Sequence, residues 1–272
     1  MNYNTKNLEG HDLYLISISG GKDSTALIDF AIKHFPHNKI QFVHAKIDID
    51  WRETIPTVKA QVEHARKLAK HDFPLHIVEA TFADGTPKGF LSKLLAPRID
   101  RVTGEAKQNQ FPDMQNRWCT SELKLAPIRK LTRELLPNGG SVLNVTGERH
   151  AESKQRSKLP YIEANESWST KAIHVTNFRP ILHLSESEVF AISTNNGYQV
   201  HPCYSWGVSR ASCAICIFSS DEEIKLALKH APHIVEDYIQ AESMISHSFR
   251  YKPATKTRPE QKTRIIDILK KA

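Results

Sequence analysis

Residues 13–35 read LYLISISGGKDSTALIDFAIKHF, and this stretch decides which fold the chain can adopt. Residues 13–18 are mostly apolar and predict a buried strand, while apolar positions at helical spacing from Ala26 onward predict a helix. Gly20 and Gly21 separate the two elements and let the backbone approach an anion without a Cβ clash. Together these features predict a phosphate-binding site, because the first N–H groups of the helix point at the anion.

The residues beside the glycine turn suit a bound phosphate. Ser19 and Ser24 add hydroxyl donors, and Lys22 adds a cation. Asp23 repels a polyphosphate unless a divalent cation lies between them, so we interpret it as a residue for Mg²⁺ or for orientation. The alternative is an ordinary acid in the first helical turn, stabilised by the helix dipole. The loop lacks the spacing of a Walker loop and the third glycine of a dinucleotide fingerprint.

The composition indicates a folded protein with a hydrophobic core. The chain has 272 residues, of which 40% are hydrophobic, and a net charge of +7. That charge is compatible with a polyanionic partner and equally with a basic, solvated surface. The sequence has no apolar run of ~20 residues and no apolar signal region, so no membrane association is expected and the expected compartment is the cytoplasm.

Alternating strand and helix patterns continue beyond the first stretch. Strands are expected at residues 39–49, 75–80 and 141–146, helices at 53–70, 121–136 and 185–195, and a loop with a short helix at 82–112. This alternation predicts an α/β fold, in which helices flank a parallel sheet. Ligands bind beyond the carboxyl ends of such strands, where Asp48 and Asp50 are expected as nucleotide contacts or as turn acids. We expect one domain at residues 1–184 and a Cys-containing, basic and mainly helical region at 185–272.

A second group of polar residues follows the strand expected at 141–146. Arg149 and Arg156 come after the carboxyl end of that strand, where a phosphate would lie. Guanidinium groups bind phosphate through paired hydrogen bonds, so we expect both arginines to contact phosphate or substrate. The alternative is solvated charge.

Four cysteines form the third group. Cys213 and Cys216 make a C-x-x-C pair, with Cys203 and Cys119 upstream. Such a pair presents two thiolates to one metal or cluster. The spacing leaves four interpretations open: a [4Fe–4S] cluster, a zinc site on four cysteines or on three with a histidine such as His201, a redox dithiol, or incidental buried thiols.

These motifs resemble known families. The SGGKDS loop is similar to the SGGxDS loop of the N-type ATP pyrophosphatases, which split ATP between its α and β phosphates. Three further segments resemble the phosphoadenosine phosphosulfate (PAPS) reductase-like family: RWCT at 117–120 with Lys124 and Pro127, GER at 147–149 with Glu152, Ser153 and Arg156, and HPCY at 201–204 with Gly207, Arg210 and the C-x-x-C pair. The motifs cover about residues 13–218 and imply a Rossmann-like, adenine nucleotide alpha hydrolase-like sheet.

The resemblance also implies roles for individual residues. Implied nucleotide contacts are Ser19, Gly20, Gly21, Lys22, Asp23, Ser24, Asp48, Gly147 and Arg149, and among them Lys22, Asp23 and Arg149 would be catalytic. Implied substrate contacts are Lys124, Glu152, Ser153 and Arg156, and the implied [4Fe–4S] ligands are Cys119, Cys203, Cys213 and Cys216.

The cysteine pattern separates subgroups of this family. True PAPS reductases carry a catalytic cysteine near the C-terminus, whereas here no cysteine follows Cys216. The four-cysteine pattern instead resembles the iron–sulfur proteins of the DndC and SspD type, which insert sulfur into DNA as phosphorothioate. This resemblance implies an enzyme that uses ATP and Mg²⁺ to adenylate the DNA backbone. It also implies that a cysteine desulfurase then supplies the sulfur. The resemblance is compatible with an oligomeric protein.

Other interpretations remain open at the level of sequence. The basic residues of 250–271, with Tyr251 for base stacking, favour a nucleic acid partner, either DNA or tRNA, although a solvated basic helix explains them equally. One alternative function is a PAPS or adenylyl-sulfate reductase that releases sulfite. Another is a non-catalytic nucleotide- or DNA-binding module with structural zinc.

Overall fold

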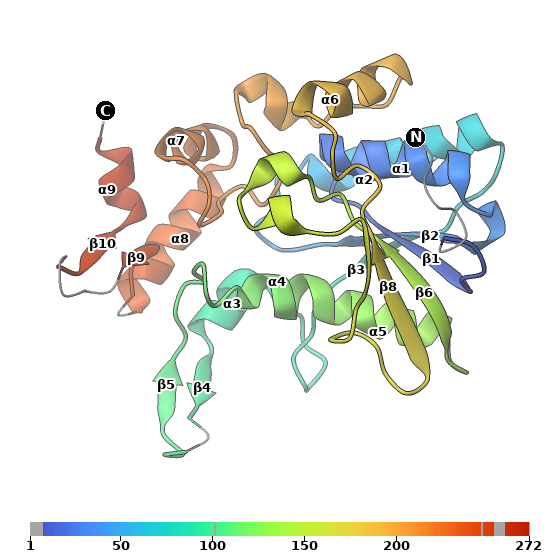
Figure 1. Cartoon of the computed structure of the whole chain (residues 1–272). Helices are drawn as coiled ribbons and strands as arrows, with labels where there is room; N and C mark the ends of the chain where they lie inside the picture. Colours follow the sequence, from blue (N-terminus) through green and yellow to red (C-terminus); the bar gives the residue numbers. More distant parts are fainter. Residues whose placement is uncertain (1–7, 101, 246, 253–258, 272) are drawn as a thin grey trace. The chain divides into compact units, whose positions relative to one another are not determined.

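The structure is a computed structural model that describes residues 8–100, 102–245, 247–252 and 259–271 (Figure 1). The chain forms two compact units. One, here called the sheet unit, comprises Met1–Ala45, Glu53–Val78 and Ile128–Tyr204. The other, here called the cysteine unit, comprises Lys46–Arg52, Glu79–Pro127 and Ser205–Ala272.

The sheet unit is built on six strands in the order β3-β2-β1-β6-β8-β7. The strands are β1 (Leu13–Ser17), β2 (Ile40–Ala45), β3 (Leu75–Val78), β6 (Gly140–Val145), β7 (Ile162–Ala164) and β8 (Ile173–Phe178). Every neighbouring pair is parallel except β7 and β8, which are antiparallel. The predicted α/β class, a largely parallel Rossmann-like sheet with flanking helices, is confirmed.

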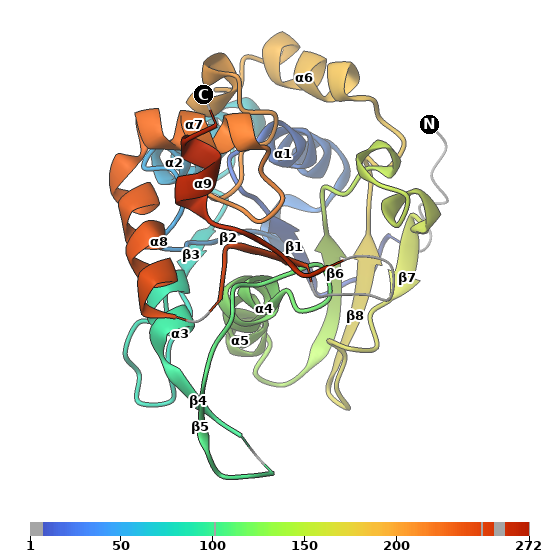
Figure 2. The ribbon, with the colours of Figure 1, turned by 90° about the vertical axis from the view of Figure 1, so that its left-hand side faces the viewer.

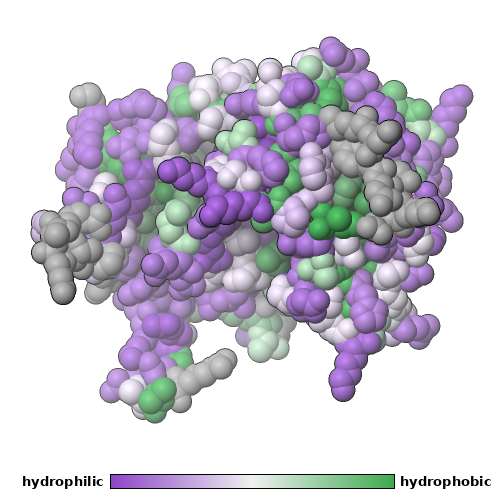
Figure 3. All heavy atoms as spheres, in the orientation of Figure 1, coloured by the Kyte–Doolittle hydropathy of each residue, from purple (hydrophilic) through white to green (hydrophobic). Residues whose placement is uncertain are grey.

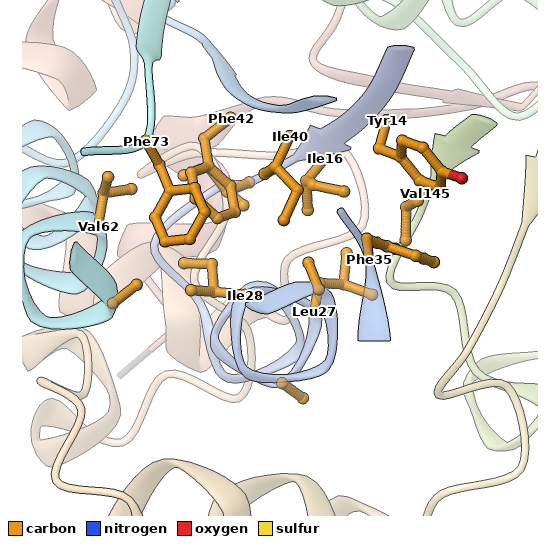
Figure 4. Close-up of a cluster of buried hydrophobic side chains, with 14 of the residues drawn as sticks. Tyr14, Ile16, Leu27, Ile28, Phe35, Ile40, Phe42, Val62, Phe73 and Val145 are labelled. Atoms are coloured by element: carbon orange, nitrogen blue, oxygen red, sulfur yellow. The ribbon is translucent and has the colours of Figure 1, made fainter. Parts of the chain in front are cut away.

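Helices cover both faces of this sheet (Figure 1). The helices of the unit are α1 (Lys22–His34), α2 (Thr54–Ala69), α5 (Ala126–Leu135) and α6 (Glu186–Asn195), with short turns η2 (His37–Lys39), η4 (His150–Glu152), η5 (Arg156–Lys158) and η6 (Pro202–Trp206). On one face, Leu27 and Ile28 of α1 and Val62 of α2 pack against strand residues such as Ile16 and Phe42 (Figure 4). Side chains of α5 pack on the other face. Burial on both faces explains the nearly continuous apolar runs of β1 and β2.

The cysteine unit contains more helix than strand. Its elements are α3 (Phe90–Leu95), β4 (Pro97–Ile99), β5 (Ala106–Gln108), α4 (Trp118–Thr120), η3 (Ser121–Leu125), α7 (Asp221–His230), α8 (Pro232–Met244), β9 (Arg250–Lys252), β10 (Gln261–Thr263) and α9 (Ile265–Leu269). Figure 2 shows α7, α8 and α9 packed side by side. Aromatic rings form the core, where Phe90 of α3 stacks on Trp118 and on Tyr238 of α8 at centroid distances of 5.0 and 5.1 Å.

Pro127 lies within a helix, and the structure shows how the helix accommodates it. The segment Ser121–Leu125 is a π-helical turn between α4 and α5, in which the N–H of Ala126 donates to the carbonyl of Ser121. Pro127, which has no N–H to donate, directly follows this wider turn as the second residue of α5. The chain therefore stays helical from Trp118 to Leu135.

Two short strand pairings differ from expectation. The loop expected at 82–112 contains the antiparallel hairpin of β4 and β5, whose residues are exposed. Strands β7 and β8, which follow the strand expected at 141–146, form an antiparallel pair in which β7 is the edge strand.

The surface in Figure 3 is mostly hydrophilic, with hydrophobic side chains in small patches. Among the described residues, no helix is both long and apolar enough to span a bilayer.

Candidate functional site

The glycine turn connects β1 to α1 and has a fixed backbone. Gly20 has a φ of +78°, a left-handed conformation that favours glycine. Its carbonyl accepts a hydrogen bond of 3.0 Å from Nε2 of Gln61, a buried side chain on α2. The N–H of Ser19 donates to Ser24 Oγ at 2.7 Å, and the two hydroxyls lie 3.0 Å apart. The predicted anion-binding turn is therefore held in place by side chains of its own unit.

The segment after β6 meets the first turn of α1. Strands β1 and β6 are parallel neighbours, so the residues that follow them lie at the same edge of the sheet. Arg149 is buried, and its Nε donates to Asp23 Oδ1 at 2.6 Å. Gly147 allows this approach, because a Cβ atom there would lie only 3.3 Å from the Cβ of Asp23. The structure thus brings together the predicted site residues Asp23, Gly147 and Arg149.

The predicted substrate residues after Arg149 form a connected group. The carboxylate of Glu152 accepts a 2.9 Å hydrogen bond from the N–H of Arg149 and forms an ion pair with Arg156. The hydroxyl of Ser153 accepts from the N–H of Arg156 at 3.2 Å. Glu152 therefore neutralises Arg156 and positions the chain beside Arg149.

Lys22 has partners that the sequence did not reveal. Its Nζ lies 3.0 Å from a carboxylate oxygen of Glu186 and 5.0 Å from the centroid of the Tyr204 ring. In the sequence, Glu186 is recognisable only as part of a helix start, and Tyr204 only as part of the HPCY motif. Neither feature predicts a contact with Lys22. In the same motif, His201 Nε2 lies 3.2 Å from Thr54 Oγ1, so the motif is fixed to α2.

Asp48 lies in the cysteine unit and acts as a helix cap. Its carboxylate accepts hydrogen bonds from the N–H groups of Phe90 at 2.6 Å and Leu91 at 3.3 Å, at the start of α3. Gly89 leaves room for this contact, since a Cβ there would lie 2.3 Å from Asp48 Oδ2. The turn-acid alternative for Asp48 thus has a structural basis, and its contact with a nucleotide stays a prediction. Asp50, also expected at this edge, accepts from the N–H of Ile47 at 3.0 Å.

Three of the four cysteines gather around Lys124 in the cysteine unit. Lys124 Nζ lies 3.8 Å from Cys213 Sγ. Burial raises the pKa of the Cys213 and Cys119 thiols; the Lys124 ammonium opposes this shift at both, and Cys216 adds to it. Lys124, predicted to bind substrate, is therefore placed among thiols. The fourth cysteine, Cys203, belongs to the sheet unit, where its N–H donates to His201 Nδ1 at 3.1 Å.

Three thiols beside one cation are a donor set with the chemistry of a thiophilic metal or iron–sulfur cluster. Within the residues that the structure describes, no three His, Cys, Asp or Glu side chains have the arrangement of a metal-ion site. The suitability of the site for a cluster therefore rests on the chemistry of the thiols.

The basic C-terminal segment is partly neutralised by acids of its own unit. Arg250 pairs with Asp221 at 2.5 Å, and Lys262 lies 3.3 Å from Glu260. The ring of Tyr251, predicted to stack on a base, lies 5.0 Å from the ring of His247. The two cations Lys256 and Arg258 of the predicted nucleic acid surface lie outside the described residues.

The chain is similar to two curated proteins. A protein of Escherichia phage 186, described as an uncharacterized 37.8 kDa protein in the gpa 5' region, is 26% identical over an alignment of 260 positions that covers 85% of this chain and 75% of the phage protein. An uncharacterized protein of Methanocaldococcus jannaschii is 22% identical over 82% of this chain, which spans only 40% of that protein.

Solved structures give a more distant likeness. The PAPS reductase of Candida auris, in its phosphate complex, is 17% identical with a TM-score of 0.45, covering 79% of this chain and 86% of that chain. The U34-tRNA thiolase of Methanococcus maripaludis with its [4Fe–4S] cluster is 12% identical with a TM-score of 0.43. The match covers 88% of this chain and 74% of the thiolase chain.

The family follows from a match over most of the chain. The sequence model of one protein family, the phosphoadenosine phosphosulfate reductase domain, matches residues 14–219 of this chain. The matched range runs from β1 to just beyond Cys216. This range contains the glycine turn, the Arg149 segment and all four cysteines. The chain therefore belongs to the phosphoadenosine phosphosulfate reductase domain family.

Proposed function

We propose that the chain is an ATP pyrophosphatase that adenylates its substrate as the first step of sulfur transfer. The single observation that carries this proposal is the contact between Arg149 and Asp23, which places a guanidinium group at the first turn of α1, beside the glycine turn. The start of a helix, a lysine and an arginine are groups that bind polyphosphate, and here they are the first turn of α1, Lys22 and Arg149. Family membership supports a nucleotide as the ligand.

The chain's own groups assign the chemical roles. A substrate oxygen attacks the α phosphorus of ATP, the bond to the β-phosphate oxygen breaks, and pyrophosphate leaves. Lys22 and Arg149 stabilise the negative charge that develops on the phosphates, which is electrostatic catalysis by preorganised donors. Asp23 orients Arg149 through the 2.6 Å contact. Asp23, the acidic residue in the first turn of α1, is the residue that would hold a bound Mg²⁺. When bound, the Mg²⁺ would neutralise charge on the departing pyrophosphate.

For the acceptor we propose the DNA backbone, with tRNA as the alternative. The net charge of +7 and the four-cysteine pattern support a nucleic acid substrate and sulfur chemistry. After adenylation, sulfur at the hydrosulfide level attacks the activated phosphorus and AMP leaves, so that one sulfur replaces one oxygen. A cysteine desulfurase is the proposed donor, and a thiol reduces its persulfide to hydrosulfide.

The cysteine unit supplies a place for the sulfur chemistry. Cys119, Cys213 and Cys216 share this unit with Lys124, so we propose that these three thiols hold a [4Fe–4S] cluster. When bound, the cluster would supply iron to which sulfide can bind. Cys203 as a fourth ligand stays a prediction from the sequence.

The test uses purified protein with ATP, Mg²⁺, sulfide and double-stranded DNA. The proposal predicts pyrophosphate release that depends on DNA, followed by phosphorothioate linkages detectable by nuclease digestion and mass spectrometry. Pyrophosphate release that depends on tRNA and not on DNA would show that tRNA is the acceptor, and the proposed adenylation step would be unchanged.

A second candidate is a PAPS or adenylyl-sulfate reductase, and family membership favours it. In this reaction a thiol attacks the sulfur of the nucleotide sulfate, and sulfite is finally released. Sulfite formed from PAPS or adenylyl sulfate with thioredoxin as reductant, without consumption of ATP, would decide for this candidate.

A further inference from the structure

The side chain of Lys22 is enclosed by the start of α6 and the HPCY motif. Only 2% of the Lys22 side chain is exposed, and its ammonium lies 3.0 Å from the carboxylate of Glu186. The same ammonium lies 5.4 Å from the centroid of the Phe190 ring and 5.0 Å from that of Tyr204. These two rings contact each other edge to face at 5.1 Å. The cation proposed to bind phosphate is thus held by a carboxylate and two aromatic rings.

Tyr204 also occupies the start of α1. The backbone N–H of Lys22 donates a hydrogen bond of 3.0 Å to the hydroxyl of Tyr204. An amide has one proton, so this N–H cannot donate fully to both the hydroxyl and a phosphate oxygen. All these contacts lie within the sheet unit, where α6 packs along α1 (Figures 1 and 2).

We propose that Glu186 and Tyr204 form a gate that closes the phosphate site and that a polyphosphate must open. This inference rests on the proposed function, because it assumes that the ligand of Lys22 is a nucleotide phosphate. The carboxylate of Glu186 takes the place of a phosphate at the ammonium, and the hydroxyl of Tyr204 takes the place of a phosphate oxygen at the N–H. Both are positioning residues that act through Lys22.

The geometry indicates how the gate opens. The Glu186 side chain is 58% exposed, so it can rotate into solvent at low cost once a phosphate attracts the ammonium. Repulsion between its carboxylate and the incoming phosphates favours the same movement. A closed site reduces the apparent affinity by the fraction of molecules that are open, and residues that favour the closed state therefore raise the measured Kd.

The test is calorimetric titration of the full chain with pyrophosphate and, separately, with ATP and Mg²⁺. Glu186→Gln removes the competing charge, and Tyr204→Phe removes the hydroxyl while keeping the ring over Lys22. Each variant is expected to bind about three- to tenfold more tightly than the wild type, the effect of one lost hydrogen bond or ion pair. Because both act on the same lysine, the double variant is expected to gain less than the product of the single effects.

Matched controls change the same residue types outside the gate. Glu188→Gln alters the capping box of the same helix α6, where Glu188 accepts from the N–H of Ser185. Tyr161→Phe removes a hydroxyl that bonds to His183. Both controls are expected to stay within about twofold of the wild-type Kd. The thermal midpoint of each variant, measured in parallel, identifies effects that come only from stability.

Two outcomes overturn the proposal, and they differ in what else they affect. Weaker or unchanged phosphate binding by Glu186→Gln and Tyr204→Phe, beside measurable binding by the wild type, excludes the gate and leaves the proposed function in place. Failure of the wild type and of every variant to bind pyrophosphate or ATP removes the proposed function and the gate with it. In turnover assays, removal of the gate by either substitution is expected to lower KM more than it changes kcat. Loss of a purely structural contact would instead lower kcat.

Discussion

Arg149 Nε and Asp23 Oδ1 lie 2.6 Å apart, and this contact joins the segment after β6 to the first turn of α1. Arg149 is almost fully buried, while Asp23 is 24% exposed at the side chain. A buried guanidinium requires a partner, since an unpaired buried charge is costly. The pair therefore fixes Arg149 beside the glycine turn, and both residues affect stability as well as catalysis.

Replacing Asp23 is expected to destabilise the protein. Asp23→Ala should lower the free energy of unfolding by about 1–3 kcal/mol, because it removes a charged hydrogen-bond partner from buried Arg149. Urea denaturation measures the change. The control is Lys67→Met, which breaks the exposed ion pair with Glu63 on α2 and should cost less than about 0.5 kcal/mol. Equal effects of the two substitutions would contradict the buried pairing of Arg149.

Asp48 is expected to act on stability through α3. Asp48→Ala should lower the free energy of unfolding by about 0.5–2 kcal/mol, because the N–H groups of Phe90 and Leu91 lose their acceptor. Asp48→Asn should retain most of this stability, since asparagine caps helices about as well as aspartate. A loss of ATP affinity in Asp48→Ala at unchanged stability would instead support the predicted nucleotide contact.

The thiols near Lys124 give a pH-dependent prediction. In metal-free protein, alkylation of Cys119 by iodoacetamide should have a midpoint above about 8.5, because burial raises the pKa of this thiol. Lys124→Met should move the midpoint further up, since it removes the ammonium that lowers this pKa. Mass spectrometry of the modified peptide across pH measures both midpoints. A lower midpoint in Lys124→Met than in the wild type would contradict the placement of Lys124.

The raised thiol pKa also determines the sign of a stability effect. The folded protein holds the Cys119 proton more tightly than the unfolded chain does. The contribution of this group to stability is therefore complete below the unfolded pKa of about 8.5 and is lost as the pH rises through the folded pKa. Stability of metal-free protein should fall more steeply above that pH than stability of Cys119→Ala. Parallel curves for the two proteins would count against a buried thiol.

Iron content distinguishes the cysteines. After anaerobic reconstitution, Cys119→Ser, Cys213→Ser and Cys216→Ser should each lose most of the iron and acid-labile sulfide, since these thiols share the cysteine unit. Cys203→Ser tests the fourth ligand predicted from the sequence, and the three-cysteine arrangement proposed here predicts that this variant retains the iron and sulfide. Iron and sulfide assays with visible spectra measure the cluster. Loss in Cys203→Ser would restore the four-cysteine ligand set predicted from the sequence, and zinc without iron in the wild type would exclude the cluster.

Local signals in the sequence predicted much of the sheet unit. The strand expected at 13–18 is observed as Leu13–Ser17, and the helix expected at 53–70 as Thr54–Ala69. The helix expected at 185–195 begins after Ser185, whose hydroxyl accepts a hydrogen bond from the N–H of Glu188. Periodicity, glycines and caps act over a few residues, so they can be recognised without knowledge of the tertiary structure.

Contacts between distant residues were not predictable in the same way. The partnership of Lys22 with Glu186 and Tyr204 joins positions far apart in the chain, and neither partner carries a local signal for it. The hairpin of β4 and β5 escaped prediction because its strands are exposed and have no alternating apolar pattern. Lys124 and Cys213 are likewise far apart in the sequence, and only the tertiary structure brings the ammonium and the thiol together.

The products formed from ATP test the central claim most directly. ATP labelled at the α phosphate is incubated with the protein, Mg²⁺ and DNA, and the products are separated by thin-layer chromatography. The account predicts labelled AMP, or an AMP–substrate adduct, with one pyrophosphate for each ATP consumed, and a rate about 10²–10³ lower in Lys22→Met. Labelled ADP with inorganic phosphate as the only products would contradict it.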